Sequence, residues 1–165
     1  MYQLCVWIHI TMAAIWVGGL VYTALVVVPY ALGHEPEERQ RILRGFGRRF
    51  RLIGWGAVGT AVMSGLGNLA LRYPPVTSAQ LFNGQAFRAD VAGEAAATWL
   101  PWKLGLVGLM IVLMAFHDIT SIRAAKKYEG SRDAAPGNRA GTIAASLATV
   151  IALAVIYVSV RLVRG

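Results

Sequence analysis

Four long runs of apolar residues, separated by polar segments, dominate the pattern along this chain. They cover about 4–32, 52–71, 100–122 and 142–163. Each run reaches the roughly 20 residues that an α-helix needs to cross a ~30 Å hydrocarbon core. Strand-like alternation is absent, and backbone groups in lipid must be hydrogen-bonded within their own segment. The pattern predicts one all-α domain over residues 1–165, an integral membrane four-helix bundle.

The basic residues are concentrated between runs one and two and between runs three and four. The segment between runs two and three has only Arg72 and Arg88. Because loops rich in Lys and Arg stay in the cytoplasm, both termini are predicted to lie outside the cytoplasm. The predicted location of the protein is the inner (cytoplasmic) membrane of a bacterium. The basic residues of the two predicted cytoplasmic segments are Arg39, Arg41, Arg44, Arg48, Arg49, Arg51, Arg123, Lys126, Lys127, Arg132 and Arg139.

Composition supports lipid as the solvent. The chain is 56% hydrophobic and 15% charged, whereas soluble domains are about 25% charged. The net charge of +8 lies between the apolar runs, and no basic stripe with interleaved aromatics indicates nucleic-acid binding. The single cysteine, Cys5, excludes an intrachain disulfide and a CxxC motif.

Two connecting segments have patterns of their own. Residues 35–51 mix Glu and Arg with Ile, Leu and Phe, which predicts a short surface helix at the inner headgroups. Residues 73–99 form a long, moderately apolar connector that begins with Pro74-Pro75. Either this connector is solvated, or it folds over the outer end of the bundle.

His9 is the one strongly polar residue inside the first run. On a helix of about 3.6 residues per turn it shares a face with Met12 and Trp16. Ionisable side chains inside a membrane are costly and commonly functional. Two interpretations stay open: a metal ligand or proton-handling group, and a structural hydrogen-bonding residue.

Other polar side chains are predicted at the same depth as His9. Lys103 is either a snorkelling lysine or a cation directed at an acidic ligand group. Asn68 ends a stripe of small and polar residues that favours close helix packing or makes room for a flat cofactor. Tyr157 and Arg161 lie one turn apart, and we expect them to converge with His9, Asn68 and Lys103. The stripe consists of Gly56, Thr60, Ser64 and Asn68.

His117 lies toward the inner end of the third run, directly before Asp118. It is a metal ligand, a partner of Asp118 or an interfacial polar residue. At ~1.5 Å of rise per residue, His9 and His117 lie roughly 15–20 Å apart along the membrane normal. We therefore do not expect them to bind one metal ion, while a second haem near His117 stays open. His34 is predicted to be a solvated loop residue.

An imidazole with two cations nearby fits haem b. His9 would bind the iron, and Lys103 and Arg161 would neutralise the propionates. Asn68, Tyr157 and Trp16 are the other candidate cofactor-binding residues. Hydrolysis by acid–base catalysis is poorly supported, because the four runs contain no Asp or Glu before Asp118.

Copper is the competing cofactor. Cys5, His9 and Met12 lie near one another in the first run, and soft sulfur and nitrogen donors favour Cu(I). Two cations beside the site disfavour this alternative, since they would repel the metal ion.

Three short motifs carry a resemblance to a known family. They are residues 7–9 (WIH), 14–20 (AIWVGGL) and 102–104 (WKL), the last opening a helix that ends near His117. Over roughly residues 4–118 the chain resembles the CopD-like membrane superfamily, which includes copper resistance protein D and the HemJ-type protoporphyrinogen oxidases. The resemblance implies a four-helix membrane unit.

In the HemJ branch, the resemblance implies bound haem b with His9 as its ligand and Lys103 as a residue needed for function. Residues 21–25 (VYTAL) lack the Pro and Arg of the HemJ-type stretch. The chain is therefore placed in a small, separate branch of the superfamily.

Three functional hypotheses follow. The first is a haem b protein with a redox or electron-transfer role, in which a haem-dependent oxidoreductase activity is possible. The second is a copper-handling membrane transport protein, and the third is a non-catalytic membrane subunit of a larger complex. The expected partners are the lipid bilayer, a redox partner and, through the small-residue stripe, a second copy of the chain.

Overall fold

The computed structural model describes residues 1–72, 93–127 and 139–164. This part of the chain contains four helical segments long and apolar enough to span a membrane, and it contains no strand. The predicted all-α, multi-pass membrane fold is therefore confirmed. Its elements are α1 (Tyr2–Tyr22), the π-helix η1 (Thr23–Val27), α2 (Val28–Leu32), α3 (Pro36–Arg72), α6 (Glu94–Lys127) and α7 (Arg139–Arg164).

The first span is one continuous helical path with a π-helical turn inside it. The N–H of Val28 donates to the carbonyl of Thr23, five residues earlier, and the Thr23 hydroxyl donates to the Gly19 carbonyl at 2.6 Å. Pro29 follows directly, and a proline inside a helix lacks an N–H and clashes with the carbonyl four residues earlier. A wider turn just before Pro29 lets the helix continue to Leu32.

The prediction of a separate surface helix over residues 35–51 was wrong, because α3 runs unbroken from Pro36 to Arg72. At about 1.5 Å per residue this helix is roughly 55 Å long. Its first half packs on the end of the first span. The Phe46 ring lies 6.4 Å from that of Tyr22 and stacks on Phe50 at 5.8 Å. The Phe50 ring fills the space that a side chain on Gly19 would need.

The third span also begins earlier than predicted. Helix α6 starts at Glu94, whereas the apolar run starts at residue 100, so the end of the predicted connector is helical. Helix α6 continues to Lys127, and α7 begins at Arg139, so both helices extend into the predicted basic loop. The predictions for residues 73–92 and 128–138 lie outside the described residues.

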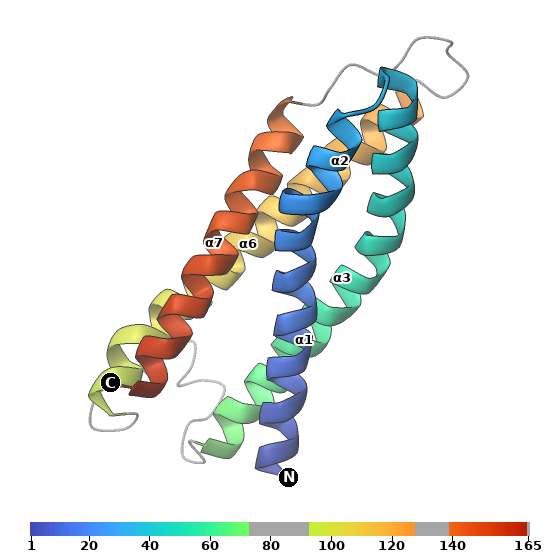
Figure 1. The fold of residues 1–165 in the computed structure, drawn as a ribbon. Coiled ribbons are helices and arrows are strands. Elements are labelled where there is room, and N and C mark those ends of the chain that lie inside the picture. The colour runs from blue at the N-terminus through green and yellow to red at the C-terminus, as the bar shows by residue number, and fades with distance from the viewer. Residues whose placement is uncertain (73–92, 128–138, 165) are drawn as a thin grey trace.

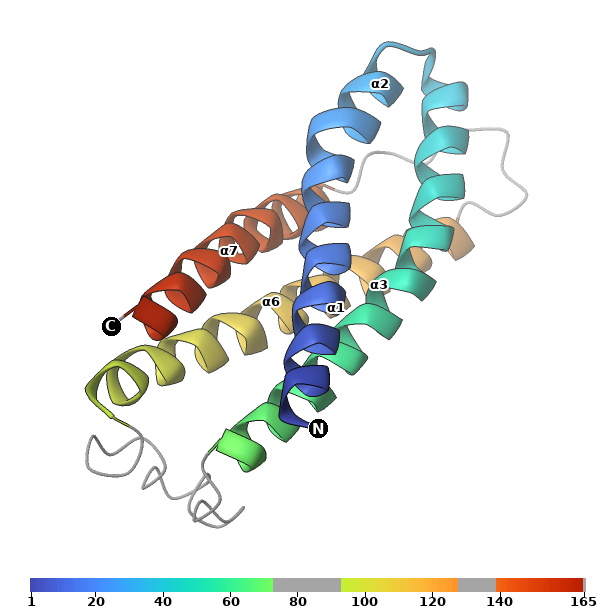
Figure 2. The same cartoon turned by 60° about the horizontal axis from the view of Figure 1, so that its bottom comes forward.

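The bundle consists of two helix pairs, α1 with α3 and α6 with α7 (Figure 1). Both chain termini lie at one end, called here the terminal end. The opposite end carries the arginines in the first half of α3 and is called the basic end. In both views α6 crosses behind α1 and α3, and the two pairs separate toward the terminal end (Figures 1 and 2).

All four long helices contribute to one apolar core where the pairs meet. Outside it, large apolar side chains are exposed all round the bundle, with Leu25, Leu52 and Val163 more than 70% exposed. This surface is expected for a protein whose solvent is lipid. The core residues are Trp16, Val17, Ala57, Val58, Met110, Met114, Ala148 and Ala152.

Candidate functional site

His9 lies half-buried between α1 and α3, and its ring is bonded to the backbone of α3. Its Nδ1 atom is 2.7 Å from the carbonyl oxygen of Ala61. A carbonyl oxygen can only accept, so Nδ1 carries the hydrogen and Nε2 keeps its lone pair. Within the described residues Nε2 has no hydrogen-bond partner. The ring therefore presents one oriented, uncommitted nitrogen donor.

Small residues of α3 let the His9 ring approach so closely. A Cβ atom on Gly65 would lie 3.0 Å from Cε1 and 3.2 Å from Nδ1 of His9. Ala61, one turn away, is buried. One turn earlier on α1, Cys5 lies against Gly67, with its Sγ 3.9 Å from where a Cβ would stand. Any side chain at position 65 would push the imidazole away from its carbonyl partner.

The seam between α1 and α3 differs from the predicted small-residue stripe. Gly56 and Thr60 are exposed in this chain, and the Ser64 hydroxyl donates to the carbonyls of Thr60 and Ala61. The residues of α3 that are buried against α1 form a second stripe, beside the predicted one. This second stripe was not predicted, although its residues recur in the sequence at spacings of three and four. It consists of Gly54, Ala57, Val58 and Ala61, continued by the half-buried Gly65.

Asn68 lies one turn from Gly65, toward the terminal end. Its side-chain oxygen is buried and has no hydrogen-bond partner among the described residues. A buried amide oxygen without a partner is costly, and native structures contain few of them. Asn68 therefore offers an unsatisfied polar group close along α3 to the residues that hold His9.

Lys103 comes from the other helix pair. It is half-buried on α6, and its positive charge lies within electrostatic range of His9. The structure therefore brings together His9 and Lys103, which the sequence analysis grouped.

Arg161 and Tyr157 lie on α7, at the terminal end of the other pair. The Arg161 guanidinium carbon is 5.2 Å from the centre of a Trp99 ring, which is a cation–π contact with α6. Tyr157 is 62% exposed. In the described part of the chain neither residue makes a hydrogen bond, ion pair or ring contact with His9 or Asn68, and the two pairs separate at this end (Figure 1).

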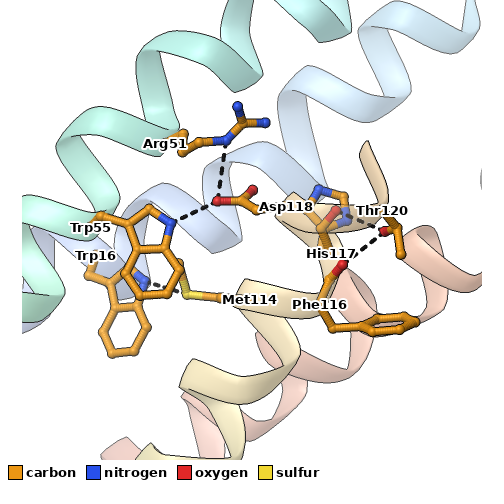
Figure 3. A network of polar contacts seen from close by, with 8 residues as sticks. All are labelled: Trp16, Arg51, Trp55, Met114, Phe116, His117, Asp118 and Thr120. Atoms are coloured by element: carbon orange, nitrogen blue, oxygen red, sulfur yellow. Dashed lines mark hydrogen bonds and ion pairs between the residues drawn. The ribbon is translucent and has the colours of Figure 1, made fainter. Parts of the chain in front are cut away.

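Trp16 and Met114 join the two pairs at the centre of the bundle (Figure 3). Trp16 is 4% exposed, and its indole N–H donates to the sulfur of Met114 at 2.9 Å. The Met114 sulfur therefore already accepts a hydrogen bond inside the protein. Trp16, which the sequence analysis placed at the cofactor, lies in the apolar core.

A polar cluster surrounds Asp118 and was not predicted from the sequence (Figure 3). The Oδ2 atom of Asp118 accepts the indole N–H of Trp55 at 2.7 Å and lies 3.2 Å from Nε of Arg51. Both partners belong to α3, so Asp118 ties α6 to the first helix pair. The signal was present in the sequence: Asp118 is the lone acid within the four apolar runs, and Arg51 borders the second run.

His117 is not a partner of Asp118. Its Nδ1 lies 2.8 Å from the carbonyl oxygen of Gly141, at the start of α7. His9 and His117 thus contact different helices. No group of three or more His, Cys, Asp or Glu side chains suited to a metal ion occurs in residues 1–72, 93–127 and 139–164.

His34 lies in the loop between α2 and α3, as predicted, and its ring is held against the end of α2. Its Nδ1 lies 2.9 Å from the Tyr30 carbonyl oxygen, and its ring centre lies 4.6 Å from that of Tyr30. This contact closes the end of α2 before the chain turns into α3.

The donors on the terminal half of the bundle fit haem b. A histidine that ligates a metal commonly donates its second ring N–H to a carbonyl, which fixes the tautomer and the ring orientation. His9 has this arrangement with Ala61. The unpartnered oxygen of Asn68 and the half-buried amine of Lys103 add polar groups near it.

Comparisons with known proteins give one related sequence and no family. An uncharacterised protein of Aquifex aeolicus (strain VF5) is 28% identical over 139 residues, covering 74% of this chain and 96% of that protein. No protein-family model matches the chain, and no solved structure matches it.

Proposed function

We propose that the protein binds haem b and has a redox or electron-transfer role in the membrane. The observation that supports this most directly is the His9 ring, whose Nδ1–H is committed to Ala61 while Nε2 stays free. This is the state in which imidazole binds a metal. His117 makes the same kind of bond, to Gly141, so the assignment to His9 also depends on the half-buried cation Lys103 and the unpartnered Asn68 oxygen on the same half of the bundle.

The residues around His9 would have distinct roles. His9 would ligate the iron through Nε2, and Gly65 and Ala61 would hold its ring in place. Lys103 would pair with a propionate, with Arg161 as a second cation at the same end of the bundle. Bound haem b supplies a one-electron couple whose potential depends on its ligands and surroundings.

The basic end is proposed to face the cytoplasm of a bacterium, with both termini outside. The support is the unequal distribution of arginines between the two ends of the bundle, because the end richer in Lys and Arg usually faces the cytoplasm. A protease-cleavable tag at either terminus of protein in right-side-out vesicles should be removed without lysis. Protection of both tags would contradict this orientation.

The visible absorption spectrum of detergent-purified protein tests the haem assignment. We expect a Soret band, and we expect His9→Ala to abolish it. The matched control is His117→Ala, which removes another half-buried imidazole that makes the same kind of bond to a carbonyl. Unchanged haem content in His9→Ala would contradict the assignment.

Copper remains the alternative cofactor, because Cys5 and His9 both contact α3 from one face of α1. A metal assay on the same sample distinguishes the two. Copper at a defined ratio without a Soret band, lost in both Cys5→Ser and His9→Ala, would replace the haem proposal. A protein that binds neither would fit a non-catalytic subunit.

A further inference from the structure

The arginines at the basic end are largely uncompensated. Arg41 pairs with Glu38 at 2.9 Å, and Arg51 pairs with Asp118 at 3.2 Å. Arg44 bonds the neutral side chain of Gln40 at 2.9 Å, and Arg48 is exposed. Among the described residues, neither Arg44 nor Arg48 has an ion-pair partner. Their positive charges are therefore available to an anion.

Three of these arginines share one face of α3. Arg44, Arg48 and Arg51 follow one another at steps of four and three residues, which places them on the same side of a helix. Trp55 continues the line, and its bond to Asp118 shows that this side faces α6. We call Arg44, Arg48 and Arg51 the arginine row. Helix α6 continues past Asp118 with another exposed cation, Arg123.

The arginine row lies where α3 leaves the apolar layer. Leu52 and Ile53 are 80% and 57% exposed, as expected of side chains in contact with lipid tails. Arg48 precedes Leu52 by one turn and Arg44 by two, which corresponds to about 6 and 12 Å along the helix. Lipid phosphates lie just outside the hydrocarbon core, so these guanidinium groups are at the depth of phosphates.

We propose that the arginine row binds the phosphate of an anionic phospholipid, with an acyl chain beside Leu52. Guanidinium groups bind phosphate oxygens through paired, charge-assisted hydrogen bonds. Asp118 engages Arg51 through Nε, which orients the side chain and leaves its two terminal nitrogens for the ligand. The adjoining exposed apolar surface favours a lipid over a free phosphate, because a free anion would not use it.

Native mass spectrometry of the detergent-purified protein tests this site. Phosphatidylglycerol and phosphatidylcholine with identical acyl chains are titrated onto the wild type and two double variants. Arg44→Gln/Arg48→Gln removes the two uncompensated charges of the row. Arg49→Gln/Arg164→Gln removes the same number of charges, one from another face of α3 and one from the terminal end.

We expect phosphatidylglycerol to bind about tenfold more tightly than phosphatidylcholine, and the row variant to lose that preference. The control variant should keep it. Equal losses in both variants would show a general attraction to positive charge and overturn the site, as would equal binding of the two lipids. Displacement of phosphatidylglycerol by millimolar inorganic phosphate would instead assign the row to a free anion and overturn the lipid proposal.

Discussion

Helix α3 makes two polar contacts inside the bundle, one with His9 and one with Asp118. They differ in whether the side chain that contacts α3 keeps a polar atom without a partner. At His9, α3 offers a carbonyl, takes one N–H and leaves the other ring nitrogen without a partner. At Asp118, α3 offers an indole N–H and a guanidinium, and both converge on one carboxylate oxygen. The first contact orients a group for something outside the chain. The second pairs the Asp118 carboxylate with the Trp55 N–H and the Arg51 charge inside the chain.

The surroundings of the two contacts explain the difference. His9 lies in a seam of small residues between helices packed along their length, so the fold does not need its bond to stay together. Asp118 joins α6 to α3, which otherwise meet mainly in the central core. A paired charge in a low-dielectric setting is costly to break. We therefore expect mutations at Asp118 to affect stability, and mutations at His9 to affect binding.

The largest expected loss of stability comes from Asp118→Ala. It would leave the Arg51 charge and the Trp55 N–H without their partner. Because both members of the ion pair keep some exposure to solvent, we expect about 2 kcal/mol, below the range for a fully buried pair. Chemical denaturation in detergent measures this. Adding Arg51→Ala should recover part of the loss, and strictly additive losses would mean that the pair is not coupled.

A smaller effect is expected for Gly65→Ala, on the His9 side of the comparison. The new Cβ would lie 3.0 Å from the His9 ring, so the ring must move, at a cost of about 1–2 kcal/mol. We also expect weaker haem binding in a Soret titration. Gly67→Ala is the matched control, because its Cβ would be in ordinary contact, 3.9 Å from Cys5 Sγ. Similar titrations for both variants would contradict the role of Gly65.

Trp16→Phe tests whether the centre of the bundle belongs to the site or to the core. Losing the N–H bond to Met114 should cost about 1 kcal/mol. The Soret band should persist if Trp16 only packs. In a double-mutant cycle with Met114→Leu, the two losses should not add. A vanished Soret band in a folded Trp16→Phe protein would return Trp16 to the cofactor site.

The smallest effect is expected for Arg161→Gln, which removes the cation from the Trp99 ring. An exposed cation–π contact contributes about 0.5 kcal/mol, so thermal unfolding should shift little. Arg164→Gln, one turn further along α7, is the control. If Arg161 pairs with a propionate, its variant should bind haem more weakly than the control, and equal haem affinities would remove Arg161 from the site.

Several features of the bundle could not be predicted from the local pattern. The separate surface helix over residues 35–51 was expected because its charges, mixed with Ile, Leu and Phe, suggested an interfacial segment. The helix continues instead, because Phe46 and Phe50 pack against the end of the first span. The π-helical turn at Thr23–Val27 also became visible only in three dimensions. In the candidate site, His9 was recognised as a rare polar group, whereas its bond to Ala61 depends on the register between α1 and α3.

The number and positions of the spans follow from the amino-acid sequence alone, because crossing a hydrocarbon layer depends on the length and polarity of each segment. These properties are local, and they also singled out His9 and Lys103. Pairing of helices, the unused nitrogen of His9 and the Asp118 cluster were decided by tertiary structure. They depend on which faces meet and in which register, and such contacts arise between residues 50 to 100 positions apart.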